Sequence, residues 1–257
     1  ALVNDMIGYS DVYMALRDAN DELWQGNRNI TDNIQLLRDF SMKQPYSLLM
    51  AAYKSLDIKI FEKLLNDVII VGFRYNVICG KNPNDIERIY NTIATQITSS
   101  GIYARDLLKA VYVDDNEFLP IFNHKIFPEN TRNNRIIKYI LGKYERFKGG
   151  TRDVVSSSET DTIEHILPQN PGTEWGEDNY DFDSLIYRLG NLCLLEKNYN
   201  RAIENKSYTE KCDMYKQSAF ETTKTIPDVY TVWNRDTINA RQKQMGDCAK
   251  SIWKIDF

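Results

Sequence analysis

One of the two histidines in this 257-residue chain stands directly after an acidic residue, in the string IEHILPQN that contains Glu164 and His165. A second string, LGNLCLLEKNYNRAIENK, follows it and contains Asn191 and Asn200. A histidine beside a carboxylate, followed by spaced asparagines, is the set of side chains that phosphodiester hydrolysis with one metal ion requires. These two strings therefore make hydrolysis of a phosphodiester the first chemistry to consider.

Each of these side-chain types suits one part of that chemistry. Histidine can deprotonate an attacking water because its unperturbed pKa lies near neutrality, so His165 is the candidate base. Carboxylate and amide oxygens suit a hard cation such as Mg²⁺ or Mn²⁺, which needs few protein ligands, so Glu164 and Asn200 are the candidate metal ligands. Asn191 is expected on a second strand, where it would hydrogen-bond the backbone around His165 and hold the base in one orientation.

The position of the acid next to the histidine sets a geometric condition. Adjacent residues on a regular strand point to opposite faces, so Glu164 and His165 can serve one site only if the strand ends or distorts there. Pro168 and the loop after it are consistent with such an end. The alternative is structural: the Glu-His pair would be a chance surface feature, and Asn191 and Asn200 would be turn and cap residues.

The chain around these strings is predicted to be mainly helical. Residues 1–148 carry apolar side chains at helical spacing, as in FEKLLNDVIIVGF, NPNDIERIYNTIATQI and NNRIIKYILGKYERF. Gly149 and Gly150 break the pattern, and a linker or loop is expected at 149–160. Strands are expected in TDTIEHIL and LGNLCLL, with a long loop at 169–183 between them. The segment SYTEKCDMYKQSAF, which opens with an S-x-x-E cap, is expected to be helical.

Composition narrows the class of protein without naming a partner. The net charge of −4 is not the footprint of a nucleic-acid-binding surface. No apolar run approaches the roughly 18 residues that a membrane span needs. The four cysteines are scattered and form no C-x-x-C pair, which favours reduced thiols in a cytoplasmic protein over a zinc site. An acidic stretch at 153–187 precedes a more basic one at 188–216, as suits a cation site that meets phosphate, or an ordinary surface.

Taken together, the strings IEHILPQN and LGNLCLLEKNYNRAIENKSYTEK, with Tyr215 and a late tryptophan-containing helix, resemble the C-terminal region of GmrSD-type modification-dependent restriction endonucleases. The resemblance covers most of residues 110–257. That region of the family contains an HNH, or His-Me finger, nuclease. The resemblance implies a mainly α fold with an embedded ββα-metal unit, divided into a helical connecting region at 1–150 and a nuclease region at 151–257.

The resemblance also implies roles for single residues. His165 matches the general base, Glu164 and Asn200 match the metal ligands, and Asn191 matches the residue that orients the base. Four further residues match positions near the substrate, with a phosphate contact expected from the first lysine: Asn198, Asn205, Lys206 and Lys211. The expected activity is that of a cytoplasmic endonuclease that uses Mg²⁺ or Mn²⁺ and cuts phage or other foreign DNA, modified or unmodified.

The family's nucleotide-hydrolysing domain carries a DGQQR-like motif, and this chain has no such string. The resemblance therefore implies a longer protein in which an N-terminal nucleotide-hydrolysing domain is the partner of this one. Two alternatives remain open from the sequence. One is a degenerate nuclease that acts as a DNA-binding or protein-interaction module, and the other is a nuclease that cleaves RNA with the same chemistry.

Overall fold

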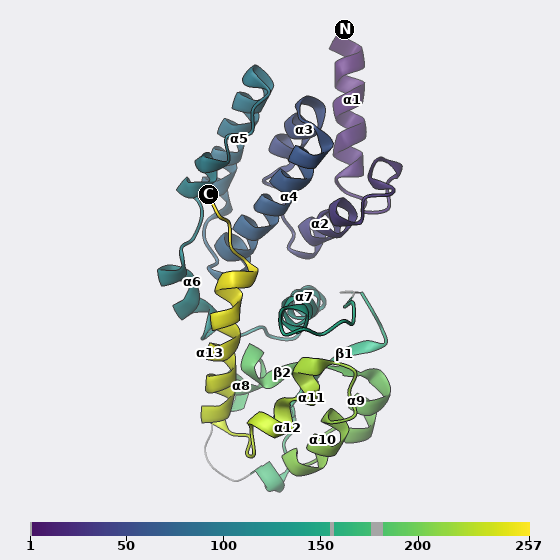
Figure 1. Cartoon of the computed structure of the whole chain (residues 1–257), viewed down its shortest axis with the longest axis vertical. Helices are drawn as coiled ribbons and strands as arrows, with labels where there is room; N and C mark the ends of the chain where they lie inside the picture. Colours follow the sequence, from purple (N-terminus) through teal and green to yellow (C-terminus); the bar gives the residue numbers. More distant parts are fainter. Residues whose placement is uncertain (1, 155–156, 176–181) are drawn as a thin grey trace. The chain divides into compact units, whose positions relative to one another are not determined.

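The computed structural model describes residues 2–154, 157–175 and 182–257, and it is mainly helical (Figure 1). The linker expected at 149–160 and the loop expected at 169–183 each include residues outside the described ones, namely 155–156 and 176–181. The chain divides into two compact units, residues 1–118 with 253–257, and residues 119–252. The functional boundary expected at residue 150 stays a prediction. No helix of the described residues is long and apolar enough to cross a membrane.

The first unit consists of helices whose ends are set by polar caps and glycine. Asn82 accepts a hydrogen bond from the Asn84 N–H at 3.0 Å just before Pro83 begins α5, and Gly101 ends that helix with a left-handed φ of 66°. The elements of this unit are α1 (Leu2–Ala15), η1 (Glu22–Trp24), α2 (Arg28–Asp39), α3 (Tyr46–Ser55), α4 (Ile58–Gly72), the π-helix η2 (Phe73–Ile78), α5 (Pro83–Ser100), the 3-10 helix η3 (Arg105–Ala110) and the start of α6 (Asp115–Phe122).

A buried arginine ties the end of the chain into the first unit. The Arg74 side chain donates hydrogen bonds to the carbonyl oxygens of Trp253 at 2.6 Å and Val113 at 2.8 Å. Phe73 stacks on the Trp253 ring with the ring centroids 4.3 Å apart. Because a buried guanidinium has to find acceptors for its N–H groups, these bonds make the last residues of the chain part of this core.

The second unit contains two strands and the helices that pack on them (Figure 1). The two predicted strands and the helix after them are confirmed, and so is the S-x-x-E cap, which Ser207 and Glu210 form at the head of α10. The elements of this unit are α7 (Thr131–Phe147), β1 (Asp161–His165), η4 (Thr173–Trp175), α8 (Phe182–Ile186), η5 (Leu189–Asn191), β2 (Leu192–Glu196), α9 (Lys197–Ile203), α10 (Tyr208–Tyr215), α11 (Glu221–Lys224), α12 (Ile226–Val229) and α13 (Arg235–Ile252).

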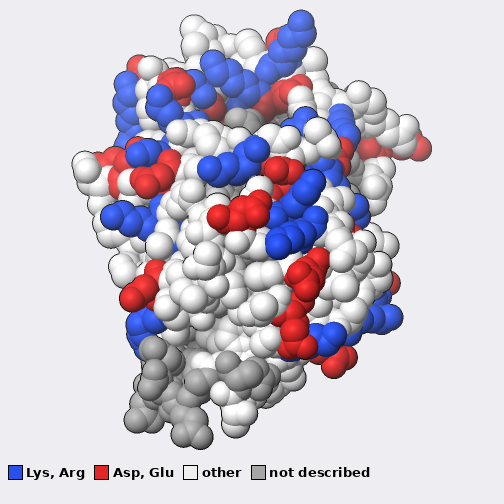
Figure 2. Space-filling model, turned by 60° about the horizontal axis from the view of Figure 1, so that its bottom comes forward, with Lys and Arg blue, Asp and Glu red and all other residues white. Residues whose placement is uncertain are grey.

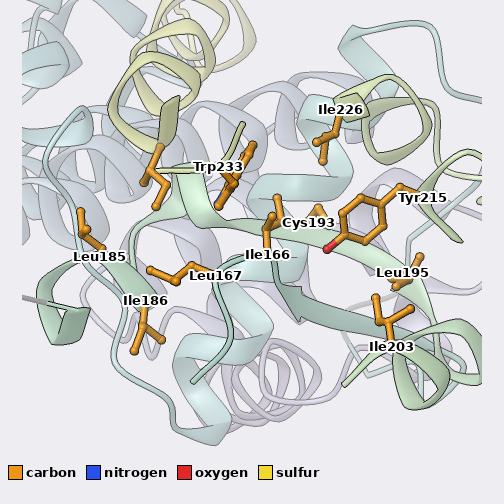
Figure 3. Close-up of a cluster of buried hydrophobic side chains, with 11 residues drawn as sticks. Ile166, Leu167, Leu185, Ile186, Cys193, Leu195, Ile203, Tyr215, Ile226 and Trp233 are labelled. Carbon is orange, nitrogen blue, oxygen red and sulfur yellow. The ribbon is translucent and has the colours of Figure 1, made fainter. Parts of the chain in front are cut away.

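The two strands form an antiparallel hairpin, which is the one sheet among the described residues. Its register runs from Asp161 opposite Glu196 to His165 opposite Leu192. One face of the hairpin meets an apolar cluster (Figure 3) that consists of Ile166, Leu167, Leu185, Ile186, Cys193, Leu195, Ile203, Tyr215, Ile226, Trp233 and Ile238. Because an isolated two-stranded hairpin is marginally stable in water, this cluster is what holds the strands together.

The C-terminal helix α13 packs directly against the turn that precedes β2. A Cβ atom added at Gly190 would lie 2.1 Å from the carbonyl oxygen of Ile238, so only glycine allows this approach. Arg241 Nη1 donates to the carbonyl oxygens of Gly190 and Leu192, both at 2.8 Å. The backbone N–H of Gly190 in turn donates to Gln242 Oε1 at 3.2 Å. These contacts place the 3-10 turn η5 against α13.

We expect Gly190→Ala to lower the free energy of unfolding by about 1–3 kcal/mol, because the added methyl group forces α13 away from the turn. Urea unfolding followed by circular dichroism measures this loss. Gly80→Asn is the control, because Gly80 has a left-handed φ of 61°, which asparagine tolerates, and nothing within 4 Å of an added Cβ. Equal stability of the Gly190→Ala variant and the parent would contradict the close approach.

Candidate active site

His165 is the last residue of β1, and the alternation of the strand directs its side chain to the face opposite that of Glu164. It pairs with Leu192, and its ring meets the Tyr187 ring edge-on with the centroids 5.8 Å apart. Burial lowers the pKa of His165 to about 4, and Lys211 lowers it further, while Glu129 acts in the opposite direction. The imidazole is therefore neutral near pH 7, which is the form that a general base needs.

Asn191 holds the chain just after the histidine. Its Oδ1 accepts the Leu167 N–H at 2.8 Å, and its Nδ2 donates to the Leu167 carbonyl at 2.9 Å. Trp233 Nε1 donates to the same Oδ1 at 2.9 Å, and Nδ2 also donates to the Ile186 carbonyl at 3.0 Å. The expected bond to the backbone near His165 is present. The expected position on the second strand is wrong, because Asn191 ends the 3-10 turn η5 one residue before β2.

Glu164 is buried and lies against α10. Its Oε1 accepts hydrogen bonds from Lys211 Nζ at 2.7 Å and from the Tyr215 hydroxyl at 2.9 Å. Figure 3 shows the Tyr215 ring beside the hairpin, inside the apolar cluster. Burial raises the pKa of the Glu164 carboxyl, and the Lys211 ammonium, the Tyr215 hydroxyl and the His165 backbone N–H act against that rise. Lys211 Nζ also donates to the His165 carbonyl at 2.9 Å, so one ammonium contacts both residues of the Glu-His pair.

The strand remains regular through the Glu-His pair. Glu164 is opposite Cys193 and His165 is opposite Leu192, in unbroken register. Their side chains therefore leave opposite faces of the hairpin, as the alternation of a strand requires. The distortion that would bring both side chains to one side is not seen here, and β1 ends at His165, three residues before Pro168.

Asn200 lies on α9, which follows the second strand directly. Its Nδ2 donates to Thr162 Oγ1 at 2.8 Å and to the Ile163 carbonyl at 3.1 Å. Thr162 and Glu164 are two residues apart on β1 and so share a face. Asn200 therefore contacts the face of the hairpin on which the other candidate oxygen ligand, Glu164, lies.

The four residues expected near the substrate fall into two groups. Asn198, Asn205 and Lys206 are exposed on α9 and the segment after it, where a substrate can reach them. Lys211 is fully buried, and its ammonium pairs with Glu164, so in this structure it does not present a charge to a phosphate at the surface.

The donor atoms do not fit a divalent ion bound to Glu164 in this arrangement. The Glu164 carboxylate already balances an ammonium at 2.7 Å, and a further cation there would be repelled by Lys211. Among the residues that the structure describes, no three His, Cys, Asp or Glu side chains gather closely enough to hold a metal ion. Asn200 supplies an amide oxygen, but its contacts on the described chain are made through Nδ2.

Two residues of the site were not singled out for a role from the sequence. Tyr215 follows Lys211 by four residues on α10, so the helical period places both on one face, and that spacing was a usable signal. Trp233 supplies a donor to Asn191 from a segment 42 residues away, and no local pattern indicates such a contact.

Charged side chains of both signs lie on the face of the molecule shown in Figure 2. On the face shown in Figure 2, acidic and basic side chains alternate, and no broad area has a single sign. That face therefore shows no electrostatic footprint of the kind that attracts nucleic acid without regard to sequence.

We expect Asn191→Ala to reduce the free energy of unfolding by more than about 3 kcal/mol, because it leaves several buried donors and acceptors without partners. Chemical denaturation measures the loss, and the emission of Trp233 reports on the lost Nε1 bond. Asn198→Ala, at an exposed position on the neighbouring helix, is the matched control and should keep parental stability. A parental unfolding curve for Asn191→Ala would contradict the structural role of this side chain.

We expect the His165 ring to stay neutral as the pH is lowered until about pH 4, because burial disfavours the imidazolium. The unfolded chain binds the proton near pH 6.5, so the free energy of unfolding falls as the pH drops from about 6.5 to about 4. Titration of the imidazole carbon-bound protons by NMR, assigned with a His165→Gln variant, measures the pKa. A midpoint near 6.5 in the folded protein would show that the ring is solvated.

Comparison with known proteins gives the family. A family model described as "GmrSD restriction endonucleases, C-terminal domain" matches residues 112–248, which include the hairpin, α9, α10 and most of α13. A comparison with curated proteins gave no match. The family match covers more than half of the chain, and it agrees with the resemblance carried by the two strings around His165 and Asn191. The chain therefore belongs to the GmrSD restriction endonuclease family, and it carries that family's C-terminal domain.

Proposed function

We propose that this chain is the nuclease region of a restriction system and that it hydrolyses DNA phosphodiester bonds with His165 as the general base. The single observation that carries this proposal is the position of His165. This residue ends the first strand of an antiparallel hairpin that a helix follows, within the segment that matches the family. The same order of elements supports assignment of the unit to the HNH, or His-Me finger, class.

Two side chains, those of Lys211 and Asn191, hold the main chain next to His165 by hydrogen bonds. Lys211 bonds the carbonyl of His165, and Asn191 bonds both backbone groups of Leu167, so the main chain is held on both sides of Ile166. A base held in one orientation loses little entropy when it takes the proton of the attacking water. In this proposal the neutral imidazole accepts that proton while the water oxygen attacks the phosphorus. The P–O bond to the leaving nucleotide breaks, and the leaving oxygen takes a proton from solvent.

Exposed polar groups beside the hairpin are the proposed contacts to the substrate. Asn198, Asn205 and Lys206 are exposed near α9, and an ammonium such as that of Lys206 can pair with a phosphate. DNA, modified or unmodified, is the proposed substrate, and an N-terminal nucleotide-hydrolysing domain of the same protein is the proposed partner. Dependence on Mg²⁺ or Mn²⁺ stays a prediction, and no step of the reaction is assigned to a metal here.

A second candidate function is a degenerate nuclease that acts as a binding module. The observation that favours it is the engagement of Glu164 by Lys211, which removes an expected metal ligand. The net charge of −4 and the mixed charges in Figure 2 favour protein over nucleic acid as the partner of such a module. Cleavage of DNA by the parent distinguishes the two, because a degenerate module does not hydrolyse phosphodiester bonds.

Cleavage of plasmid DNA tests the proposed function. We expect nicking by the parent in Mg²⁺ or Mn²⁺, its loss with a chelator, and a drop of about 10²–10⁴-fold in His165→Ala, the range that removal of a general base gives. Parallel assays on modified plasmid, unmodified plasmid and RNA identify the substrate.

His124→Ala is the matched control for that assay. His124 is exposed, and its substitution removes the same kind of side chain elsewhere in the second unit. Parental activity in His165→Ala would disprove the assignment of the base. Cleavage of RNA with no cleavage of DNA would disprove the assignment of the substrate.

A further inference from the structure

The cation nearest to Glu164 belongs to the protein itself. Lys211 Nζ lies 2.7 Å from Glu164 Oε1, and the two side chains are 0% and 4% exposed. The Tyr215 hydroxyl donates to the same oxygen at 2.9 Å. One carboxylate thus accepts from an ammonium and a hydroxyl in a space closed to water.

The local sequence builds this cluster by helical period. The capping box of Ser207 and Glu210 sets where α10 begins. From that start, Lys211 and Tyr215 lie four residues apart and so on one face of the helix, which is the face that meets Glu164 on β1. The cluster is therefore part of how α10 packs on the hairpin, and it does not depend on a chance rotamer of an exposed lysine.

The charge balance of the cluster bears on any metal ion. A divalent cation at the Glu164 carboxylate would lie within a few ångströms of the Lys211 ammonium, and at the low effective dielectric of a buried site the repulsion is large. The single negative charge of Glu164 is already matched by the single positive charge of Lys211. The carboxylate therefore offers a divalent ion little net attraction while the ammonium is in place.

We propose that Lys211 is the cation of Glu164 in this protein, so that Glu164 does not bind a divalent metal ion and becomes able to do so only when the charge of Lys211 is removed. The inference rests on the proposed function only in treating Glu164 and His165 as parts of one site. The Lys211 ammonium also has a structural role, because the same Nζ donates to the His165 carbonyl and so connects the main chain of the base to α10.

Paramagnetic broadening by Mn²⁺ in the parent protein is the first test. Amide signals are recorded by ¹⁵N-correlated NMR as Mn²⁺ is added up to equimolar amounts. We expect any loss of the signals of Glu164, His165 and Cys193 to be the same in Glu164→Gln as in the parent. Selective broadening of these signals in the parent that Glu164→Gln abolishes would overturn the proposal.

Removal of the ammonium is the second test. We expect Lys211→Met to bind Mn²⁺ at least about tenfold more tightly than the parent by calorimetry, because the repulsion is gone and the carboxylate is unbalanced. The double variant Glu164→Gln/Lys211→Met, which replaces the ion pair by neutral side chains of similar shape, should lose that gain. Lys216→Met, which removes an exposed lysine just after α10, is the matched control and should bind Mn²⁺ as the parent does.

The outcomes separate this inference from the proposed nuclease activity. An Mn²⁺ affinity of Lys211→Met no higher than that of the parent would overturn the inference, whatever the plasmid assay shows. If Lys211→Met does not fold, a tenfold fall in Mn²⁺ affinity in Glu164→Gln relative to the parent would overturn it, and an unchanged affinity would support it. Loss of cleavage in His165→Ala reports on the base alone and leaves both results readable.

Discussion

The hydrogen bonds of the Asn191 side chain are the interaction on which the rest of the site depends. This one amide joins the segment after β1, through both backbone groups of Leu167, to the end of α8 and to Trp233. A two-stranded hairpin has little stability of its own, so its end needs such a connection to have one geometry. Because the amide is fully buried, each bond that is lost leaves an unsatisfied polar group, and the site resists partial opening.

Burial determines which charges are stable on the face of the hairpin that carries Glu164. The Glu164 carboxylate points into an apolar cluster, where an isolated charge would be costly, and Lys211 and Tyr215 reduce that cost. Among the residues that the structure describes, His165 on the opposite face has no carboxylate at such close range, and burial lowers its pKa. The two adjacent residues therefore differ in charge: Glu164 is paired with a cation, and His165 is neutral.

Much of the fold and part of the site could be predicted from local patterns. The apolar stripes predicted α4, α5 and α7, and a string that begins with β-branched residues and a short apolar run predicted the two strands, because such patterns are local properties. Asn191 was predicted on the second strand but ends the turn η5 before it, since a short turn and the start of a strand can have similar compositions. Lys211 was predicted near the substrate, and its burial could not be predicted, because burial depends on which helix packs on which face of the hairpin.

The sequence by itself determined the kinds of side chains available, their order along the chain and the family to which the chain belongs. The spacing of Lys211 and Tyr215 on one helical face was also a property of the sequence alone. Only the tertiary structure decided which partner each of them meets. Glu164 could have faced a metal ion or an ammonium with the same neighbours in sequence, and it faces the ammonium because α10 packs against that side of the hairpin. The partner comes from 47 residues away, a separation over which no local pattern acts.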